Sequence, residues 1–223
     1  MTTDKIKQFI KEAHDNAVEK GFYDCPECNE DGIFVDGVLE SGFDIECPTC
    51  YNTGIDPNKN IGELLMLIVS ELGEALEAHR KNEIECDIDD IIENITSFNP
   101  ILFRAGIKQM EIYKNYFPFE IADVFIRLFD LCGYLRIEPE IESEYSELSI
   151  FDNIGEHLLK ITEFICFCFY KGGNGEIDRE ESISISFSSL LDLCNRLDIP
   201  IERHITAKMA YNRTRPYKHR KEY

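Results

Sequence analysis

The segment Glu63–Arg80 (ELLMLIVSELGEALEAHR) constrains the fold more than any other, because it predicts a long helix with one charge in an unusual place. One apolar stripe recurs at helical spacing and consists of Leu65, Ile68, Leu72 and Leu76. Glu71 does not lie opposite this stripe. On a helical wheel its neighbours form a second apolar face, made of Leu64, Leu67, Ala75 and Ala78. A carboxylate in such surroundings is costly to bury unless a cation pairs with it.

The same helix offers a second carboxylate but no basic residue for either to pair with. Glu74 follows Glu71 by about one turn and can face the same point. The residues from Ile61 to His79 include no Lys or Arg. Converging carboxylates of this kind favour a hard divalent cation, Mg²⁺ or Mn²⁺. A solvated acidic edge on a core helix is the alternative that the pattern leaves open.

Length and charge limit the classes of protein to consider. The chain has 223 residues, which is enough for one domain, or for one domain plus a small module. It has no apolar run long enough to span a bilayer and no apolar core of a signal peptide, so we expect a cytoplasmic protein without a membrane partner. A net charge of −20 makes nucleic acid an unlikely partner for the chain as a whole. From Glu202 onward, however, seven Lys and Arg residues stand against two Glu, so this tail can receive an anion.

Four cysteines form two matching motifs of the form C-P-x-C-x-x-x-G. The first pair is Cys25 and Cys28, and the second is Cys47 and Cys50. Four sulfurs at these spacings fit a tetrahedral, structural Zn²⁺ site, and the alternating residues between the pairs predict a short hairpin. A redox motif would be single and would open a helix. The segment resembles the zinc knuckles of chaperone-type zinc-finger domains.

The apolar patterns divide the chain into three parts. Residues 1–20 predict the N-terminal helix of a bundle, residues 21–57 a zinc-knuckle insertion, and residues 58–223 an all-α domain with a basic C-terminal tail. Within the last part we expect helices over 84–95 and 101–116, and a further helix that Pro118 opens.

Glu120 and Asp123, in the helix after Pro118, are three residues apart and therefore share a face. They are candidates to meet the carboxylates of the 63–80 helix. Arg127 and Asp130 continue the same stripe, which is also typical of an ordinary solvated helix face. Spacing alone does not separate these two interpretations.

The second half of the chain weakly repeats the first. The sequence at 62–72 (GELLMLIVSEL) recurs as GEHLLKITEF at 155–164, and 128–142 recurs as 190–203. A degenerate tandem repeat is one interpretation, and coincidence between Leu-rich helices is the other. In the second copy, Ser182 and Ile185 stand at the positions of Glu120 and Asp123, so that copy would have lost its acids.

The basic tail carries a set of anion-binding side chains. Lys208, Asn212 and Arg215 recur at spacings of four and three and can face one side. An ammonium, an amide and a guanidinium together suit a phosphate. With four carboxylates for a divalent cation, the chain has both halves of a phosphoryl-transfer site.

Three segments, SELGEALEA, FEIADVFIRLFDL and KMAYNRTRPYKH, resemble the E-x-x-E, E-x-x-D and K-x-x-x-N-x-x-R motifs of the MazG-type all-α nucleoside triphosphate pyrophosphohydrolases. The tail most resembles that of the phage and prophage members. The resemblance covers 61–130 and 201–219 and implies an all-α bundle of the MazG or dimeric-dUTPase type. It also implies a homodimer or homotetramer that hydrolyses a nucleoside triphosphate to the monophosphate and pyrophosphate with Mg²⁺.

The resemblance assigns roles by position. The metal ligands would be Glu71, Glu74, Glu120 and Asp123. The substrate contacts would be Lys208, Asn212 and Arg215, with Tyr211 as a candidate neighbour of the base. The inserted cysteine segment and a longer connection between the acidic helices depart from the compact family pattern.

No Ser/His/Asp or Cys/His set suggests a covalent nucleophile, so we expect water to attack the α-phosphate directly. Glu71 and Glu74 would act at this centre, and Glu77 or an unligated carboxylate oxygen would accept the proton. Related substrates stay open: dUTP or dCTP, phosphoribosyl-ATP, or an alarmone. A different class also stays open, a zinc-containing helical interaction or nucleic-acid-binding regulatory protein without catalysis.

Overall fold

The helix that begins at the Phe117-Pro118 pair occupies the centre of the molecule. This helix, α5 (Phe117–Leu135), is apolar on almost every side and is buried along most of its length. It packs against α1 (Thr3–Glu19), α2 (Ile61–Arg80), α7 (Arg179–Arg196) and α8 (Ile201–Arg213). The computed structural model describes residues 1–28, 47–51, 53–141, 153–170 and 178–217. Over these residues it forms helices and no strand, which confirms the all-α prediction.

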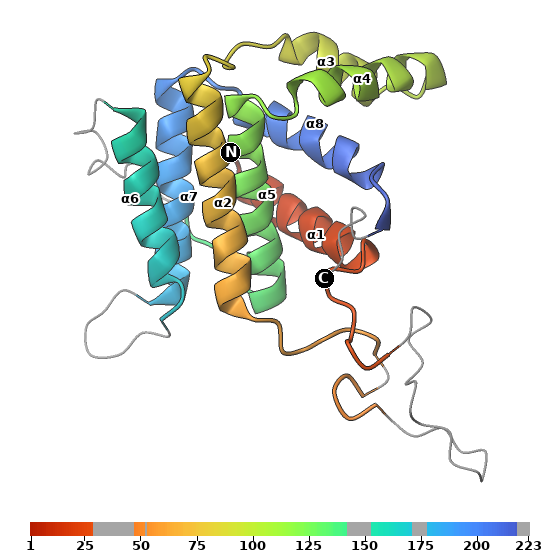
Figure 1. Cartoon of the computed structure of the whole chain (residues 1–223), viewed down its shortest axis with the longest axis vertical. Helices are drawn as coiled ribbons and strands as arrows, with labels where there is room; N and C mark the ends of the chain where they lie inside the picture. The colour runs from red at the N-terminus through yellow and green to blue at the C-terminus, as the bar shows by residue number, and fades with distance from the viewer. Residues whose placement is uncertain (29–46, 52, 142–152, 171–177, 218–223) are drawn as a thin grey trace.

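Four helices run side by side as the main layer of the fold. They are α2, α5, α7 and α6 (Ile154–Phe167), with α6 packed on both α2 and α7 (Figure 1). Their facing side chains form the largest apolar core, in which the rings of Phe125, Phe129 and Phe187 contact one another.

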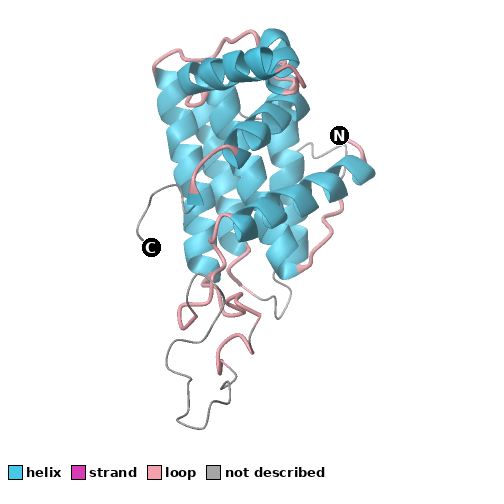
Figure 2. Cartoon of the chain, turned by 90° about the vertical axis from the view of Figure 1, so that its right-hand side faces the viewer, coloured by secondary structure: helices cyan, strands magenta, loops and turns pink. Residues whose placement is uncertain are grey.

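The remaining helices cross this layer. The short α3 (Ile88–Ile95) and α4 (Pro100–Tyr113) pack together at one end and rest on α8, while α1 and α8 run obliquely to the layer (Figures 1 and 2). The helix predicted over 84–95 begins only at Ile88, because the Asp87 side chain accepts a hydrogen bond from the amide of Asp90 and caps the first turn.

The second half of the predicted repeat forms the α6–α7 pair, on the far side of α2 and α5 from α1. Ser182 and Ile185, which stand where the first copy has Glu120 and Asp123, are both buried in α7. The duplication itself stays a prediction.

The segment that carries the cysteines follows α1 and precedes α2 in the chain, and its described residues lie beyond the lower end of the layer (Figure 1). Its two arms meet at their base, where Asp24 and Ile55 form an antiparallel bridge and the amide of Cys25 donates to the carbonyl of Gly54 at 2.8 Å. The predicted hairpin between the cysteine pairs falls within 29–46, outside the described residues. Among the helices that the structure describes, none is long and apolar enough to cross a membrane.

Candidate functional site

The predicted acidic and basic residues meet in one cavity of about 380 Å³, which we call the carboxylate cavity. It is enclosed by α1, α2, α5, the end of α4 and the C-terminal segment. Its charged and amide side chains are Asn16, Glu71, Glu74, Lys114, Asn115, Glu120, Asp123, Arg127, Asp130, Lys208, Asn212 and Arg215. Segments far apart in sequence therefore supply the acids and most of the bases to one place.

Three of the predicted carboxylates form a cluster. One oxygen from each of Glu71, Glu74 and Glu120 lies within 4.8 Å of the others. The close packing of α2 on α5 brings them together, since the first two come from α2 and the third from the first turn of α5. Carboxylate oxygens at this separation suit a hard divalent cation, so the donor set fits Mg²⁺ or Mn²⁺.

Glu71 also has a cationic partner within the protein. The guanidinium Nε of Arg127 donates to Glu71 Oε1 at 3.3 Å, and the side chain of Glu71 is only 12% exposed. Glu71 is therefore not part of a solvated acidic edge, whereas Glu74 is exposed. The basic residue absent from α2 is supplied by α5, so the absence of Lys and Arg between Ile61 and His79 did not imply the absence of a partner.

The polar stripe of α5 is not a solvated face either. Glu120 is 3% exposed and Asp130 is 8% exposed, and both line the carboxylate cavity. Of the two interpretations that spacing left open, convergence on the α2 carboxylates is the one that the structure bears out for Glu120.

Asp123 lies in the cavity but outside the three-carboxylate cluster, because it is engaged by a lysine. Lys208 Nζ is 2.7 Å from Asp123 Oδ2 and donates to the carbonyl of Lys114 at 2.5 Å. Lys208 is 4% exposed, so its ammonium is a fixed positive charge between the tail and the acids. A role in binding metal would require Asp123 to exchange this partner.

Burial and mutual repulsion raise the pKa values of the clustered acids. Burial raises the pKa of Glu120 to about 8; Lys208 opposes this, and Asp123, Glu71 and Glu74 add to it. Burial likewise raises the pKa of Glu71, as do the charges of Asp123 and Glu74, whereas Arg127 works in the opposite direction. Buried acids with raised pKa values in a cavity are typical of functional sites.

The tail residues reach the same cavity. Asn212 is 8% exposed and its side-chain Oδ1 has no hydrogen-bond partner. Arg215 lines the cavity close by. Tyr211 lines it too, and its hydroxyl donates to Glu111 at 2.6 Å, which fixes the ring. A buried amide oxygen without a partner is costly, so this side chain is suited to contact a ligand.

Glu77, predicted as a proton acceptor, does not line the cavity. It lies on the exposed side of α2 and pairs with Arg80 at 3.3 Å and Lys81 at 3.5 Å. A step of three residues falls about 60° short of a full helical turn, so Glu77 is rotated by about 120° from Glu71 around α2.

The sequence did not predict the part that α1 plays in the site. Asn16 lines the cavity between Ala13 and Ala17, and its buried Oδ1 also has no hydrogen-bond partner. The sequence did contain a signal for this role. The small residues Ala13 and Ala17 flank Asn16 on a helix whose other buried side chains are larger, which indicates that this part of the helix closely approaches another group. Asp130 was noted only as part of a stripe, yet it accepts a hydrogen bond from the Tyr23 hydroxyl at 2.9 Å.

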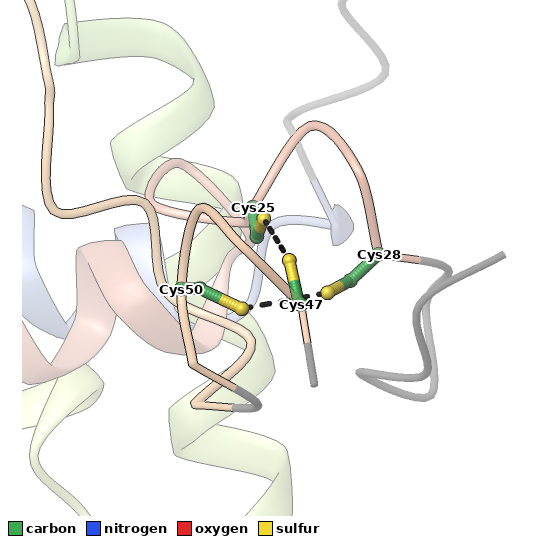
Figure 3. A group of neighbouring side chains, drawn as sticks. All are labelled: Cys25, Cys28, Cys47 and Cys50. Carbon is green, nitrogen blue, oxygen red and sulfur yellow. Dashed lines mark hydrogen bonds between the residues drawn. The ribbon is translucent and has the colours of Figure 1, made fainter. Parts of the chain in front are cut away.

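The four motif cysteines also come together (Figure 3). The Sγ atoms of Cys25 and Cys47 are 3.7 Å apart, those of Cys28 and Cys50 are 3.5 Å apart, and all four are free thiols. Zn–S bonds of about 2.3 Å in a tetrahedron place sulfurs about 3.8 Å apart, so this cluster fits a metal such as zinc. We call the described residues of this segment, 21–28, 47–51 and 53–57, the cysteine module.

Comparison of this chain with protein-family models, with curated proteins and with solved structures found no match, so the argument for function rests on the geometry described above.

Proposed function

We propose that this protein is a Mg²⁺-dependent nucleoside triphosphate pyrophosphohydrolase, which converts a nucleoside triphosphate and water to the monophosphate and pyrophosphate. One observation carries the proposal. Three carboxylate oxygens within 4.8 Å share a cavity with Lys208, Arg215 and the unpartnered amide oxygen of Asn212. Acids for a cation beside bases for an anion match the charges of a metal-bound polyphosphate.

The side chains of the cavity have different roles in the proposed reaction. Lys208 and Arg215 hold the β- and γ-phosphates and balance the charge of the departing pyrophosphate. Arg127 orients Glu71 through the bond at 3.3 Å. Mg²⁺ held by the clustered oxygens would polarise the α-phosphate and offset its developing charge.

The proton of the attacking water needs a reachable acceptor. Glu74 is the exposed member of the cluster and so meets solvent at the mouth of the cavity. As the water oxygen bonds to the α-phosphorus, the bond from that phosphorus to the bridging oxygen breaks. The water proton passes to a free oxygen of Glu74.

The alternative class, an interaction or nucleic-acid-binding regulatory protein, gives no reason to bury acids and bases together in a cavity. We therefore prefer the enzyme. Assembly into dimers or tetramers and a cytoplasmic location stay predictions of the sequence.

The test is to incubate the protein with each of the common ribo- and deoxyribonucleoside triphosphates and Mg²⁺ and to separate the products by ion-exchange chromatography. We expect a monophosphate and pyrophosphate in equal amounts from at least one nucleotide. Release of a diphosphate and orthophosphate, or no turnover of any nucleotide, would contradict the proposal.

Variants tie the activity to the cavity. Arg215→Ala removes a charge-assisted contact and should lower kcat/KM by about tenfold to a hundredfold. The matched control is Arg196→Ala, because Arg196 lies at the end of α7 in an exposed pair with Asp192 and does not line the cavity.

A further inference from the structure

A second and larger cavity, of about 970 Å³, adjoins the carboxylate cavity. The two share three lining residues, Phe22, Arg127 and Asp130. The guanidinium that holds Glu71 therefore stands at the boundary between them. We call the second space the module cavity, because both arms of the cysteine module form part of its wall.

Helix α2 lines the two cavities in succession. Its first half contributes Leu64, Leu67 and Ser70 to the module cavity, and the next turn contributes Glu71 and Glu74 to the carboxylate cavity. A ligand lying along this helix would pass from an apolar region to an acidic one within about two turns.

The two cavities differ in chemistry. Phosphate and cation ligands can be held in the carboxylate cavity by its acids and bases. The module cavity instead presents rings and aliphatic side chains, among them Phe22, Tyr23, Leu67 and Tyr217. Cavities that bind a heterocycle are mostly apolar and aromatic with a few polar groups, and pockets of about 300–1,000 Å³ hold small organic ligands.

The outer wall of the module cavity is fastened to the tail that lines the carboxylate cavity. The hydroxyl of Tyr217 donates to Asp24, which precedes the first motif cysteine. The Tyr217 ring lies against Gly21, where a Cβ atom would fall 2.4 Å from two ring carbons. Gly21 also has φ of +77°, a conformation that glycine adopts without strain. Tyr217 follows Arg215 by two residues, so one segment contributes to both cavities.

We propose that the module cavity holds the nucleoside part of the substrate, with the cysteine module as the wall against which the base packs. This inference rests on the proposed function, because it places the triphosphate of the same molecule in the carboxylate cavity. It gives the inserted segment a part in substrate recognition in addition to any part in stability.

The test fills the module cavity without touching the acids. Leu67→Trp adds bulk to the side of α2 that lines the module cavity. The matched control is Leu159→Trp on α6, a residue that is 70% exposed and lines neither cavity. Calorimetry with Mg²⁺ measures binding of α,β-methylene nucleoside triphosphates, in which the bond to be broken is replaced, and of pyrophosphate alone.

We expect Leu67→Trp to weaken binding of the nucleotide analogue by about tenfold or more, while pyrophosphate binding stays within about twofold of wild type. Leu159→Trp should change neither. Equal nucleotide affinity for Leu67→Trp and wild type would overturn the inference. Equal weakening of pyrophosphate would also overturn it, because the effect would then lie in the carboxylate cavity.

Two further measurements separate the possible failures. If Leu67→Trp does not fold, Ser70→Trp fills the same cavity from an exposed position and must give the same pattern. Wild-type turnover is measured in parallel. A wild-type protein that hydrolyses nucleotides while both Trp variants bind the analogue normally contradicts only the location of the nucleoside. A wild-type protein that neither binds nor hydrolyses any nucleotide contradicts the proposed function as well.

Discussion

The two clusters of candidate metal ligands in this protein, the four sulfurs and the three carboxylates, differ in how their negative charges are balanced. In the cysteine module four sulfurs from two tight turns face one another, and a metal held by all four would have no open coordination position. In the carboxylate cavity three oxygens share their space with Arg127 and Lys208, which compensate part of the charge before any ion arrives. We expect the first arrangement to need a bound metal to stay together. We expect the second to lose and regain a cation while the helices hold their positions.

The largest expected effect is on turnover in the carboxylate cavity. Glu71→Gln keeps the volume of the side chain but removes a charge from the cluster, so we expect activity to fall by about a hundredfold or more, roughly 3 kcal/mol of transition-state stabilisation. Stability should change by less than about 1 kcal/mol. Burial lowers the pKa of Arg127, whereas the charges of Glu71, Asp123 and Asp130 raise it, so two nearby acids still act on Arg127 when Glu71 loses its charge.

Melting and turnover measured on the same variant test this prediction. A buried pair that serves only the fold would behave in the opposite way, since removing one partner costs about 3–5 kcal/mol. A Glu71→Gln protein that melts early and still releases pyrophosphate at the wild-type rate would end the metal-site interpretation. Glu163→Gln on α6, in an exposed pair with Lys160, is the matched control.

In the cysteine module we expect the opposite result, in which a substitution lowers stability more than it lowers turnover. We expect about one zinc per chain after native purification, retained through mild EDTA washing. Cys47→Ser should lower the free energy of unfolding by on the order of 2–3 kcal/mol, or roughly 4–12 °C in Tm, because a closed site contributes folding free energy.

Turnover at saturating substrate should fall much less in Cys47→Ser than in Glu71→Gln, since Cys47 lies outside the carboxylate cavity. Elemental analysis of the purified protein checks the metal, and a preparation without zinc would remove the basis for the comparison.

The pH dependence of stability should come from the carboxylate cavity. The pKa of Glu120 is raised to about 8 in the folded protein from an ordinary value of 4.5. The unfolded chain therefore releases this proton first, and stability without added divalent cation should fall between about pH 5 and pH 8, by up to about 1.4 kcal/mol per pH unit. Glu120→Gln should flatten the slope of Tm against pH. The same slope in Glu120→Gln and in wild type would show that Glu120 does not titrate as its surroundings imply.

The smallest effect is expected at Glu77. We expect Glu77→Gln to keep turnover within about twofold of wild type, because Glu77 does not line the carboxylate cavity and its surface pairs with Arg80 and Lys81 contribute little to stability. A hundredfold loss would instead support the proton-accepting role that we predicted for Glu77 from the sequence. Single-turnover rates of this variant and of Glu74→Gln, compared side by side, decide between the two residues.

The sequence predicted the helices well because their signals are local. Asn60, Asp87 and Asn99 each cap the helix that follows, and the periodic apolar residues of α2 face the core as expected. The cysteine cluster could be predicted equally well, because the spacing of the two motifs was enough to indicate that their sulfurs come together.

Ion pairs between helices that are far apart in the chain could not be predicted from a local sequence pattern. Arg127 meets Glu71 across 56 positions and Lys208 meets Asp123 across 85, so neither ion pair leaves a periodic trace in the sequence. The same limit hid the contribution of Asn16, whose location in the cavity depends on how α1 crosses α5. Helix spacing says which side chains share a face, and only the packing of helices says what that face meets.

The central place of α5 has a consequence for synthesis on the ribosome. Helices α1 and α2 both take α5 as their main partner, and the chain between them and α5 must be made before either can bury its apolar side. During that interval Phe9, Ile68 and Leu72, which the folded protein buries, lack their partners on α5. We therefore expect translation up to about Leu135 to be the period in which the growing polypeptide depends most on chaperones, and in which slower elongation costs the most yield.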